Sequence, residues 1–184
     1  PAAARAPLAP APAPAANEQP AAPSLRLHAP LPLYPAADPA QTPPGLGSGW
    51  LIVAESPTPA DPLAGDAGRL LDNMLRAMRL HQHPRVFFAA LERSPHGPAE
   101  NAPDLAAVIA QVQPAMVLLL GHLPARAALG RAEPLGRLRA EPHVLHGRPA
   151  VVTYDPAVLL RQQDSKAAAW ADLCRALATV RAAG

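Results

Sequence analysis

The fold is decided by the stretch Trp50-Leu51-Ile52-Val53-Ala54, five apolar residues in a row that follow the turn-forming segment 43–49. A short, continuously apolar run between turn signals is typical of a strand buried on both faces. Two more runs of this kind follow along the chain, Val86-Phe87-Phe88-Ala89-Ala90 and Met116-Val117-Leu118-Leu119-Leu120. We therefore predict three buried strands.

Two amphipathic helices are predicted between these strands. Apolar residues recur at the spacing i, i+3, i+4 and i+7, which places them along one face of a helix. The two stripes are formed by Leu71, Met74, Leu75 and Met78, and by Leu105, Val108, Ile109 and Val112. Because strands and helices alternate, we predict an α/β fold, a three-layer α/β/α sandwich around a mainly parallel central sheet.

The last third of the sequence is consistent with the same fold. A short helix or turn is predicted over residues 123–129, and strands over residues 144–145 and 150–153 flank a tight turn. A C-terminal helix should follow Asp164, whose carboxylate is a suitable N-cap. The apolar stripe of that helix is predicted to consist of Trp170, Leu173, Cys174 and Leu177.

Cys174 is the only cysteine of the chain. Its place in that stripe predicts a packed thiol rather than a nucleophile. One cysteine cannot form an internal disulfide or hold a cysteine-ligated cluster, so we expect no such cofactor. No apolar run approaches the length of a membrane span. We therefore expect a cytoplasmic protein that makes no membrane contact.

The N-terminal quarter of the chain has a different composition. Of the 26 prolines, 13 fall within the first 44 residues, and the four charged residues of this stretch cancel. Proline lacks an amide donor and alanine buries little surface, so such a segment offsets its ordering entropy poorly. We predict a disordered Pro/Ala-rich linker over residues 1–48 and one folded domain over residues 49–184.

The charges of the domain are nearly balanced, because the net charge of the whole chain is only +2. This surplus does not by itself indicate a nucleic-acid-binding protein. Four arginines nevertheless gather in one stretch that also contains Glu133 and Glu141, and they are Arg126, Arg131, Arg137 and Arg139. They are candidates for phosphate contacts, or for a solvated face of mixed charge.

Two histidine pairs are the remaining candidates for a metal site. They are His81 with His83, and His143 with His146. Neither pair has a carboxylate or thiol at ligand spacing. We therefore expect surface histidines and no bound metal.

Two carboxylates follow predicted strands. In open α/β sheets, ligands bind outside the carboxyl ends of the strands. Glu55 follows the first predicted strand and Asp155 follows the last one. If they face each other, they could activate a water molecule or share a proton. Alternatively, each carboxylate caps the helix that follows it.

The order of these segments resembles the uracil-DNA glycosylase superfamily, especially its iron–sulfur, family 4 type. Val53-Ala54-Glu55-Ser56-Pro57-Thr58 resembles the family's water-activating loop G-E-A-P-G. Residues 65–72 are similar to its G-R-A-G-x-L-L-D helix start, and residues 114–121 to its P-x-x-x-x-x-L-G strand. Residues 154–161 are similar to Y-H-P-A-x-L-L-R, and residues 166–173 to K-x-x-x-W-x-D-L. The resemblance spans residues 50–181 and implies the glycosylase fold.

The same comparison implies that the active site is degenerate. The family's catalytic-loop histidine falls on Asp155, an anion where a donor should stabilise the departing uracil. The phenylalanine that stacks on the flipped base falls on Leu63, and the asparagine that reads the uracil edge falls on Ala89. Only Glu55 and Pro57 of the pocket are retained. Two of the four cluster cysteines fall near Arg93 and on Ala102, and the other two have no counterpart.

The resemblance therefore implies a non-catalytic descendant. The psi subunit of bacterial DNA polymerase III shares this fold without glycosylase activity. A psi-type subunit would have a chi-like subunit and clamp-loader subunits as partners, and it would reach single-stranded-DNA-binding protein indirectly through chi. The alternative is a divergent uracil-DNA glycosylase of base excision repair that positions water with Glu55. A third hypothesis is a DNA-binding module that uses residues 126–139, with weak DNA contact.

Overall fold

A computed structural model describes residues 24–95 and 104–184. Its centre is one sheet of strand order β1-β4-β3-β5-β7-β6, in which β2 also pairs with β4. The strands are β1 (Ser24–Leu27), β2 (Leu31–Pro32), β3 (Trp50–Glu55), β4 (Val86–Ser94), β5 (Met116–Leu120), β6 (His143–Leu145) and β7 (Arg148–Thr153). The four central strands β4, β3, β5 and β7 are parallel, which confirms the predicted mainly parallel sheet.

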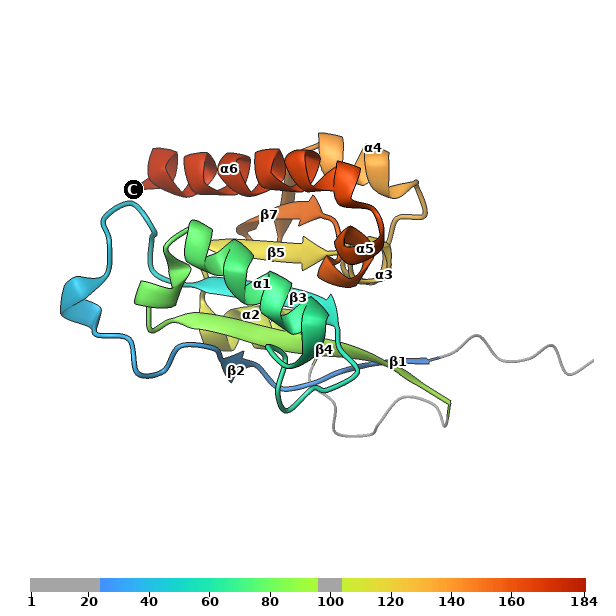
Figure 1. Cartoon of the computed structure of the whole chain (residues 1–184), viewed down its shortest axis with the longest axis horizontal. Coiled ribbons are helices and arrows are strands. Elements are labelled where there is room, and N and C mark those ends of the chain that lie inside the picture. The colour runs from blue at the N-terminus through green and yellow to red at the C-terminus, as the bar shows by residue number, and fades with distance from the viewer. Residues whose placement is uncertain (1–23, 96–103) are drawn as a thin grey trace, which may run out of the picture.

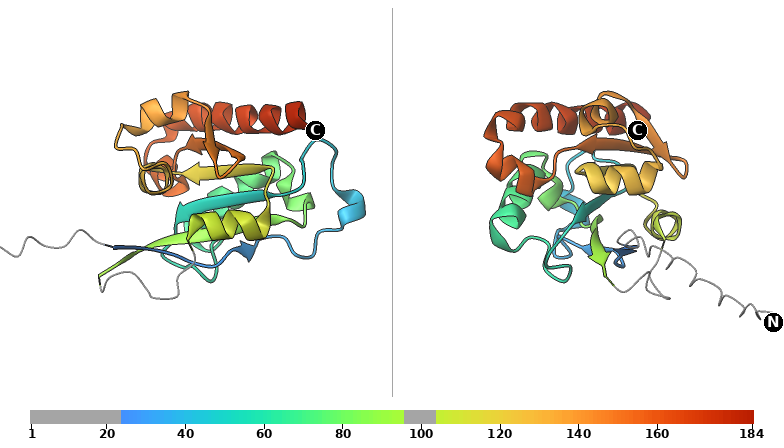
Figure 2. Two further views of the ribbon diagram at one scale, coloured as in Figure 1. Left: turned by 180° about the vertical axis from the view of Figure 1, so that it is seen from behind. Right: turned by 90° about the vertical axis from the view of Figure 1, so that its right-hand side faces the viewer.

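Helices cover both faces of the sheet (Figures 1 and 2). They are α1 (Gly65–Ala77), α2 (Leu105–Val112), α3 (His122–Leu129), α4 (Leu135–Ala140), α5 (Pro156–Arg161) and α6 (Lys166–Ala183). One core cluster joins α1 and α6 to one face, and a second joins α2, α3 and α4 to the other. The three-layer α/β/α fold is therefore confirmed. In the described part of the chain, no helix is long and apolar enough to cross a membrane.

The core strands and the helical stripes between them are as predicted. Trp50 and Met116 are fully buried, and so is Val86 at the start of β4. Leu71 and Leu75 of α1 are buried, as are Val108 and Ile109 of α2. The strand β4 is longer than expected and continues to Ser94 because it also pairs with β1.

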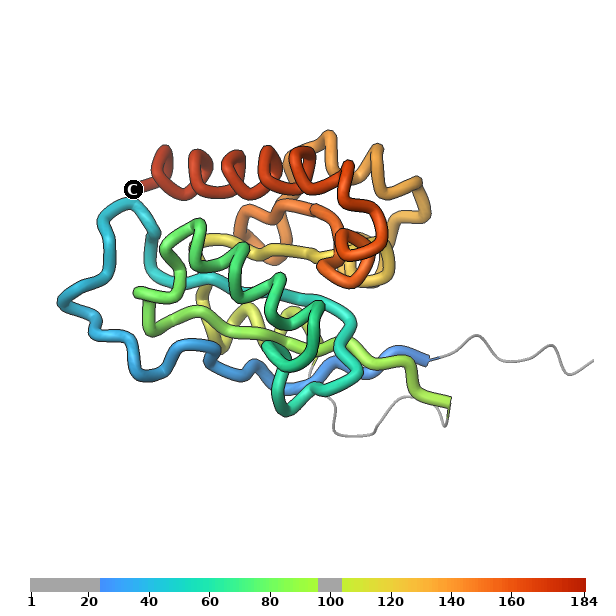
Figure 3. Tube along the Cα trace, in the orientation of Figure 1, coloured from blue at the N-terminus to red at the C-terminus, as the bar shows by residue number. Residues whose placement is uncertain are grey.

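The predicted linker over residues 1–48 is wrong for residues 24–48. Strands β1 and β2 pair antiparallel with β4, so that this segment extends the sheet at its edge. The chain then runs round the end of the sheet to reach β3, as Figure 3 shows. The hydroxyl of Tyr34 donates to Oδ1 of Asp72 on α1 at 2.6 Å, and Leu46 is buried in the core. Residues 1–23 of the predicted linker lie outside the described residues.

The predicted stripe of α6 is also partly wrong. Trp170 is 43% exposed and Cys174 is exposed, while Asp172 is buried. The helix instead turns Ala169, Asp172, Leu173, Ala176, Leu177 and Val180 toward the protein. This face is shifted because Asp172 has buried partners described below. Asp164 lies in the short 3₁₀ helix η3 (Gln163–Ser165), and α6 begins without a side-chain cap.

Candidate functional site

The two carboxylates singled out in the sequence lie at the same edge of the sheet. Glu55 is the last residue of β3, and Asp155 is the second residue after the end of β7. Both line one cavity of about 530 Å³, together with Ser56, Pro57, Arg93 and Arg161. A second cavity of about 320 Å³ also has both carboxylates in its wall and extends past His122 and Arg126. The carboxyl ends of the parallel strands therefore form the candidate site.

Glu55 is held by a cation from the neighbouring strand. The Nε of Arg93 on β4 donates to Oε1 of Glu55 at 3.0 Å. Both side chains are partly open to solvent. Arg93 lies near the position where the resemblance puts one of the cluster cysteines. The ion pair holds Glu55 beside the cavity.

Asp155 is the N-cap of α5. Its Oδ1 accepts a hydrogen bond from the backbone N–H of Ala157 at 2.7 Å, and the helix then begins at Pro156. Burial raises the pKa of the Asp155 carboxyl, and the negative charge of Glu55 raises it further, whereas the hydrogen bond from Ala157 lowers it. The capping interpretation is therefore confirmed for Asp155. At the same time, the two carboxylates are close enough to repel each other.

Gly121 has no side chain, and this makes room for the side chain of Asp155. This residue follows β5 and has a φ of +104°, a conformation that favours glycine. A Cβ added there would lie 3.1 Å from the Cβ of Asp155. The loop after β5 therefore closes tightly against the loop after β7.

Comparison with known proteins assigns a family to this arrangement. Residues 43–174 match the protein-family model described as the uracil DNA glycosylase superfamily. The chain belongs to the uracil DNA glycosylase superfamily. A search of the curated proteins found no match to this sequence.

The structure does not bring the two expected base-recognition positions of this superfamily member to the cavity wall. Leu63 packs against the core cluster beneath α1. Ala89 is fully buried on the other face of the sheet, in the cluster that contains α2. Its neighbour Phe88 instead borders a small cavity beside Pro57 and Gly68. Of the predicted pocket residues, Glu55, Pro57 and Asp155 lie together.

The four arginines of residues 126–139 have separate surroundings. Arg131 donates to Oε1 of Glu133 at 2.6 Å and to Oε2 of Glu141 at 2.7 Å. Arg137 lies 3.9 Å from the other Glu141 oxygen. Only Arg126 borders the candidate site. Arg139 is also paired with a carboxylate, that of Asp172. Three of the four arginines predicted to contact phosphate therefore have acidic partners within the protein.

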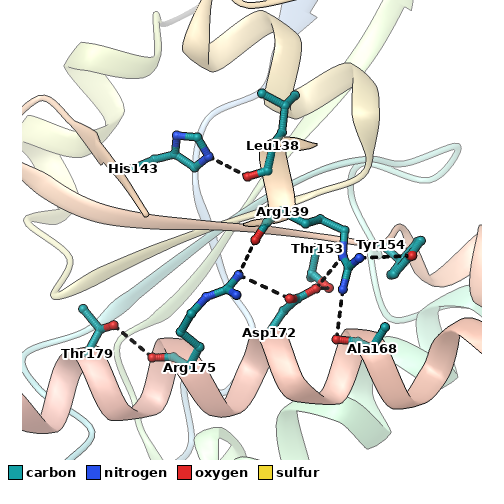
Figure 4. A network of polar contacts seen from close by, with 9 residues as sticks. All are labelled: Leu138, Arg139, His143, Thr153, Tyr154, Ala168, Asp172, Arg175 and Thr179. Atoms are coloured by element: carbon teal, nitrogen blue, oxygen red, sulfur yellow. Dashed lines mark hydrogen bonds and ion pairs between the residues drawn. The ribbon is translucent and has the colours of Figure 1, made fainter. Parts of the chain in front are cut away.

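Arg139 belongs to a buried polar network between α4, α6 and β7 (Figure 4). Its Nε donates to Oδ2 of Asp172 at 2.7 Å, and its guanidinium lies 4.3 Å from the ring centroid of Tyr154. The hydroxyl of Thr153 donates to the same Oδ2 at 2.8 Å, and Arg175 donates to Oδ1 at 3.2 Å. Asp172 is 3% exposed. The network is structural, and the sequence did not indicate it.

Two of the four histidines are buried, which corrects the expectation of surface residues. His83 donates from Nε2 to the carbonyl of Gly47 at 3.0 Å and accepts at Nδ1 from the N–H of Arg85. His143 donates to the carbonyl of Leu138 at 2.7 Å. Within residues 24–95 and 104–184, no three histidine, cysteine or acidic side chains are grouped as metal ligands.

The residues do not fit the four-cysteine iron–sulfur cluster of the family 4 enzymes. Such a cluster needs four thiolates, and the sequence has one cysteine, which is exposed on α6. Arg93 is paired with Glu55, and Ala102 lies outside the described residues.

Proposed function

We propose that this superfamily member is a non-catalytic adaptor in DNA replication, of the type of the psi subunit of bacterial DNA polymerase III. The observation that carries the proposal is the pair of carboxylates, Glu55 and Asp155, in the wall of one cavity. Excision of a base leaves negative charge on the departing ring, and preorganised hydrogen-bond donors are needed to stabilise that charge. Two carboxylates in the cavity wall would instead repel the negative charge on the departing base.

The surroundings of both carboxylates support the same conclusion. Asp155 uses one oxygen to cap α5, and Glu55 uses one oxygen in its ion pair with Arg93. Both groups thus have partners within the protein. The expected base-reading position, Ala89, is fully buried in the core cluster that includes α2 and does not line this cavity. These features favour retention of the fold for a purpose other than catalysis.

The adaptor proposal names a chi-like subunit and the clamp-loader subunits as partners, with single-stranded-DNA-binding protein reached through chi. The test is size-exclusion chromatography of the full chain with purified chi subunit and with purified clamp loader from the same source. We expect co-elution with chi in a stable complex. Elution of the chain as a free species in both mixtures would overturn the proposal.

A divergent uracil-DNA glycosylase of base excision repair is the second candidate. It is favoured by the position of Glu55 and Pro57 at a cavity of about 530 Å³ that Arg93 and Arg161 also border. The discriminating assay is formation of abasic sites in a uracil-containing single strand. This candidate predicts cleavage that is lost in Glu55→Ala. Cleavage that survives this substitution would indicate a contaminating enzyme.

A further inference from the structure

A groove lies between α1 and α6, away from the carboxylates of the candidate site. It has a volume of about 230 Å³ and is lined almost entirely by apolar atoms. The contributing residues include Leu70 and Met74 of α1, Leu159 of α5, and Lys166, Trp170 and Leu173 of α6. The α1 residues are spaced as one helical stripe, and so are the α6 residues. One stripe from each helix therefore contributes to the walls.

Trp170 is the feature of this groove that the fold leaves uncovered. Its side chain is 43% exposed, although tryptophan is a large apolar residue that proteins usually bury for the most part. Tryptophan is also enriched among the residues that dominate binding energy at protein interfaces. An uncovered tryptophan on an apolar groove thus indicates a binding surface for a protein.

Lys166 gives the groove a charge at one end. It is exposed, lies one turn before Trp170 on α6, and has no ion-pair partner within the described residues. The arginines on the neighbouring α1 differ, because Arg69 is paired with Asp66 and Arg76 with Asp72. The one available cation of the groove is therefore complementary to a carboxylate of a partner.

We infer that this groove docks an amphipathic helix of a partner protein, which inserts a large apolar side chain beside Trp170 and places an acidic residue on Lys166. The inference rests on the proposed adaptor function and gives it a binding surface. The groove has room for such an anchor, since a cavity of about 150 Å³ already accommodates a benzene ring. Helices commonly dock in apolar grooves through residues at i, i+4 and i+7.

A second copy of the chain fits the groove less well than a different protein. In a symmetric dimer the same patch meets itself, and the residues that line this groove include no carboxylate that could pair with Lys166. A nucleic acid is also a poor fit, because the apolar walls offer a single cation. The charge therefore favours an acidic partner helix.

The direct test uses the fluorescence of Trp170 in the full chain. The only other tryptophan, Trp50, is fully buried, so a binding-induced change reports Trp170. The probe is a tryptophan-free, alanine-based helical peptide of about 18 residues, long enough to be helical in water. It carries leucines at i, i+4 and i+7 and a glutamate one turn from the first leucine. A matched peptide carries lysine in place of glutamate.

We expect the glutamate peptide to shift Trp170 emission to the blue and to protect it from acrylamide quenching. The lysine peptide should bind about tenfold more weakly, and Lys166→Glu should reverse this preference. Equal effects of both peptides, or no effect of either, would overturn the inference. Concentration-dependent dimerisation that Trp170→Ala abolishes would also overturn it, because the occupant would then be a second copy.

Two variants separate this inference from the proposed function. Trp170→Ala should weaken binding of the chi subunit about tenfold or more, as expected for a central anchor residue. Leu160→Ala is the matched control, since Leu160 is 39% exposed on α5 and does not line the groove. Equal chi binding by both variants would overturn the inference that the groove docks a partner helix, but it would not contradict the adaptor function. Absence of chi binding by the unaltered chain would instead overturn the adaptor function. The peptide titration would then show by itself whether the groove binds an acidic amphipathic helix.

Discussion

Arg93 and Glu55 form an ion pair between the neighbouring strands β4 and β3, with Nε of the arginine 3.0 Å from Oε1 of the glutamate. The glutamate is the carboxylate that the resemblance places in the water-activating loop. Asp155 lines the same cavity, where burial raises the pKa of its carboxyl and the charge of Glu55 raises it further.

Substitution of Arg93 tests whether this ion pair prevents Glu55 from supporting uracil excision. Arg93→Ala releases Glu55, but the Asp155 carboxylate stays in the cavity, so we expect no uracil excision by the variant. The pair is partly exposed, and its loss should change the free energy of unfolding by less than about 1 kcal/mol. Abasic-site assays and urea unfolding measure both quantities. Excision that begins in Arg93→Ala would show that the site is intact and merely locked.

Asp155→Asn should stabilise the fold at neutral pH. The pKa of Asp155 is higher in the folded protein than in the unfolded chain, so ionisation of this carboxyl destabilises the fold. The destabilisation is absent at a pH below the unfolded-state pKa and is complete at a pH above the folded-state pKa. Asparagine keeps the N-cap without the charge. Thermal unfolding should give a higher Tm for Asp155→Asn at pH 7, with the difference shrinking toward pH 3. A lower Tm at pH 7 would contradict the raised pKa.

Loss of Asp172 should be strongly destabilising. Asp172→Ala leaves the guanidinium of Arg139 largely buried without its carboxylate, and breaking such a pair costs about 3 to 5 kcal/mol. The matched control is Asp66→Ala, which breaks the exposed ion pair with Arg69 and should cost less than about 1 kcal/mol. Urea unfolding of both variants gives the comparison. Equal losses would show that the network in Figure 4 contributes little.

Two helical glycines give a matched test of packing. A Cβ at Gly68 of α1 would lie 2.2 Å from the backbone carbonyl carbon of Leu63, so Gly68→Ala should destabilise by about 1 to 3 kcal/mol. In the described structure, a Cβ at Gly136 of α4 meets no atom within 4 Å. Gly136→Ala should therefore stabilise by up to about 1 kcal/mol. Chemical unfolding should show that the free energy of unfolding falls in Gly68→Ala and rises in Gly136→Ala. An equal decrease in both variants would contradict the packing described at these two glycines.

The sequence predicts the central strands well because their apolar runs are continuous and bounded by turns. It also predicts the meeting of Glu55 and Asp155, since carboxyl ends of parallel strands share one edge. The strands at residues 24–32 escape prediction because prolines interrupt the alternation of Leu25, Leu27 and Leu31. Pro32 is tolerated there because β2 pairs with β4 at the edge of the sheet.

Charged residues limit what a pattern can reveal about the site. Asp172 looks like a solvent-facing residue of α6, and only its contacts with Arg139 and Thr153 explain why it is buried. For the same reason, Arg139 cannot be separated from Arg126 in the sequence, although one is in a buried network and the other borders a cavity. Tertiary partners, rather than spacing, decide the roles of such residues.

The proposed adaptor function implies that this member of the superfamily does not excise bases. The most direct measurement is release of uracil from a single-stranded oligonucleotide under single-turnover conditions, with the full chain in excess and Glu55→Ala in parallel. We predict that both proteins give the same background as a reaction without protein. Uracil release by the unaltered chain that Glu55→Ala abolishes would contradict the claim.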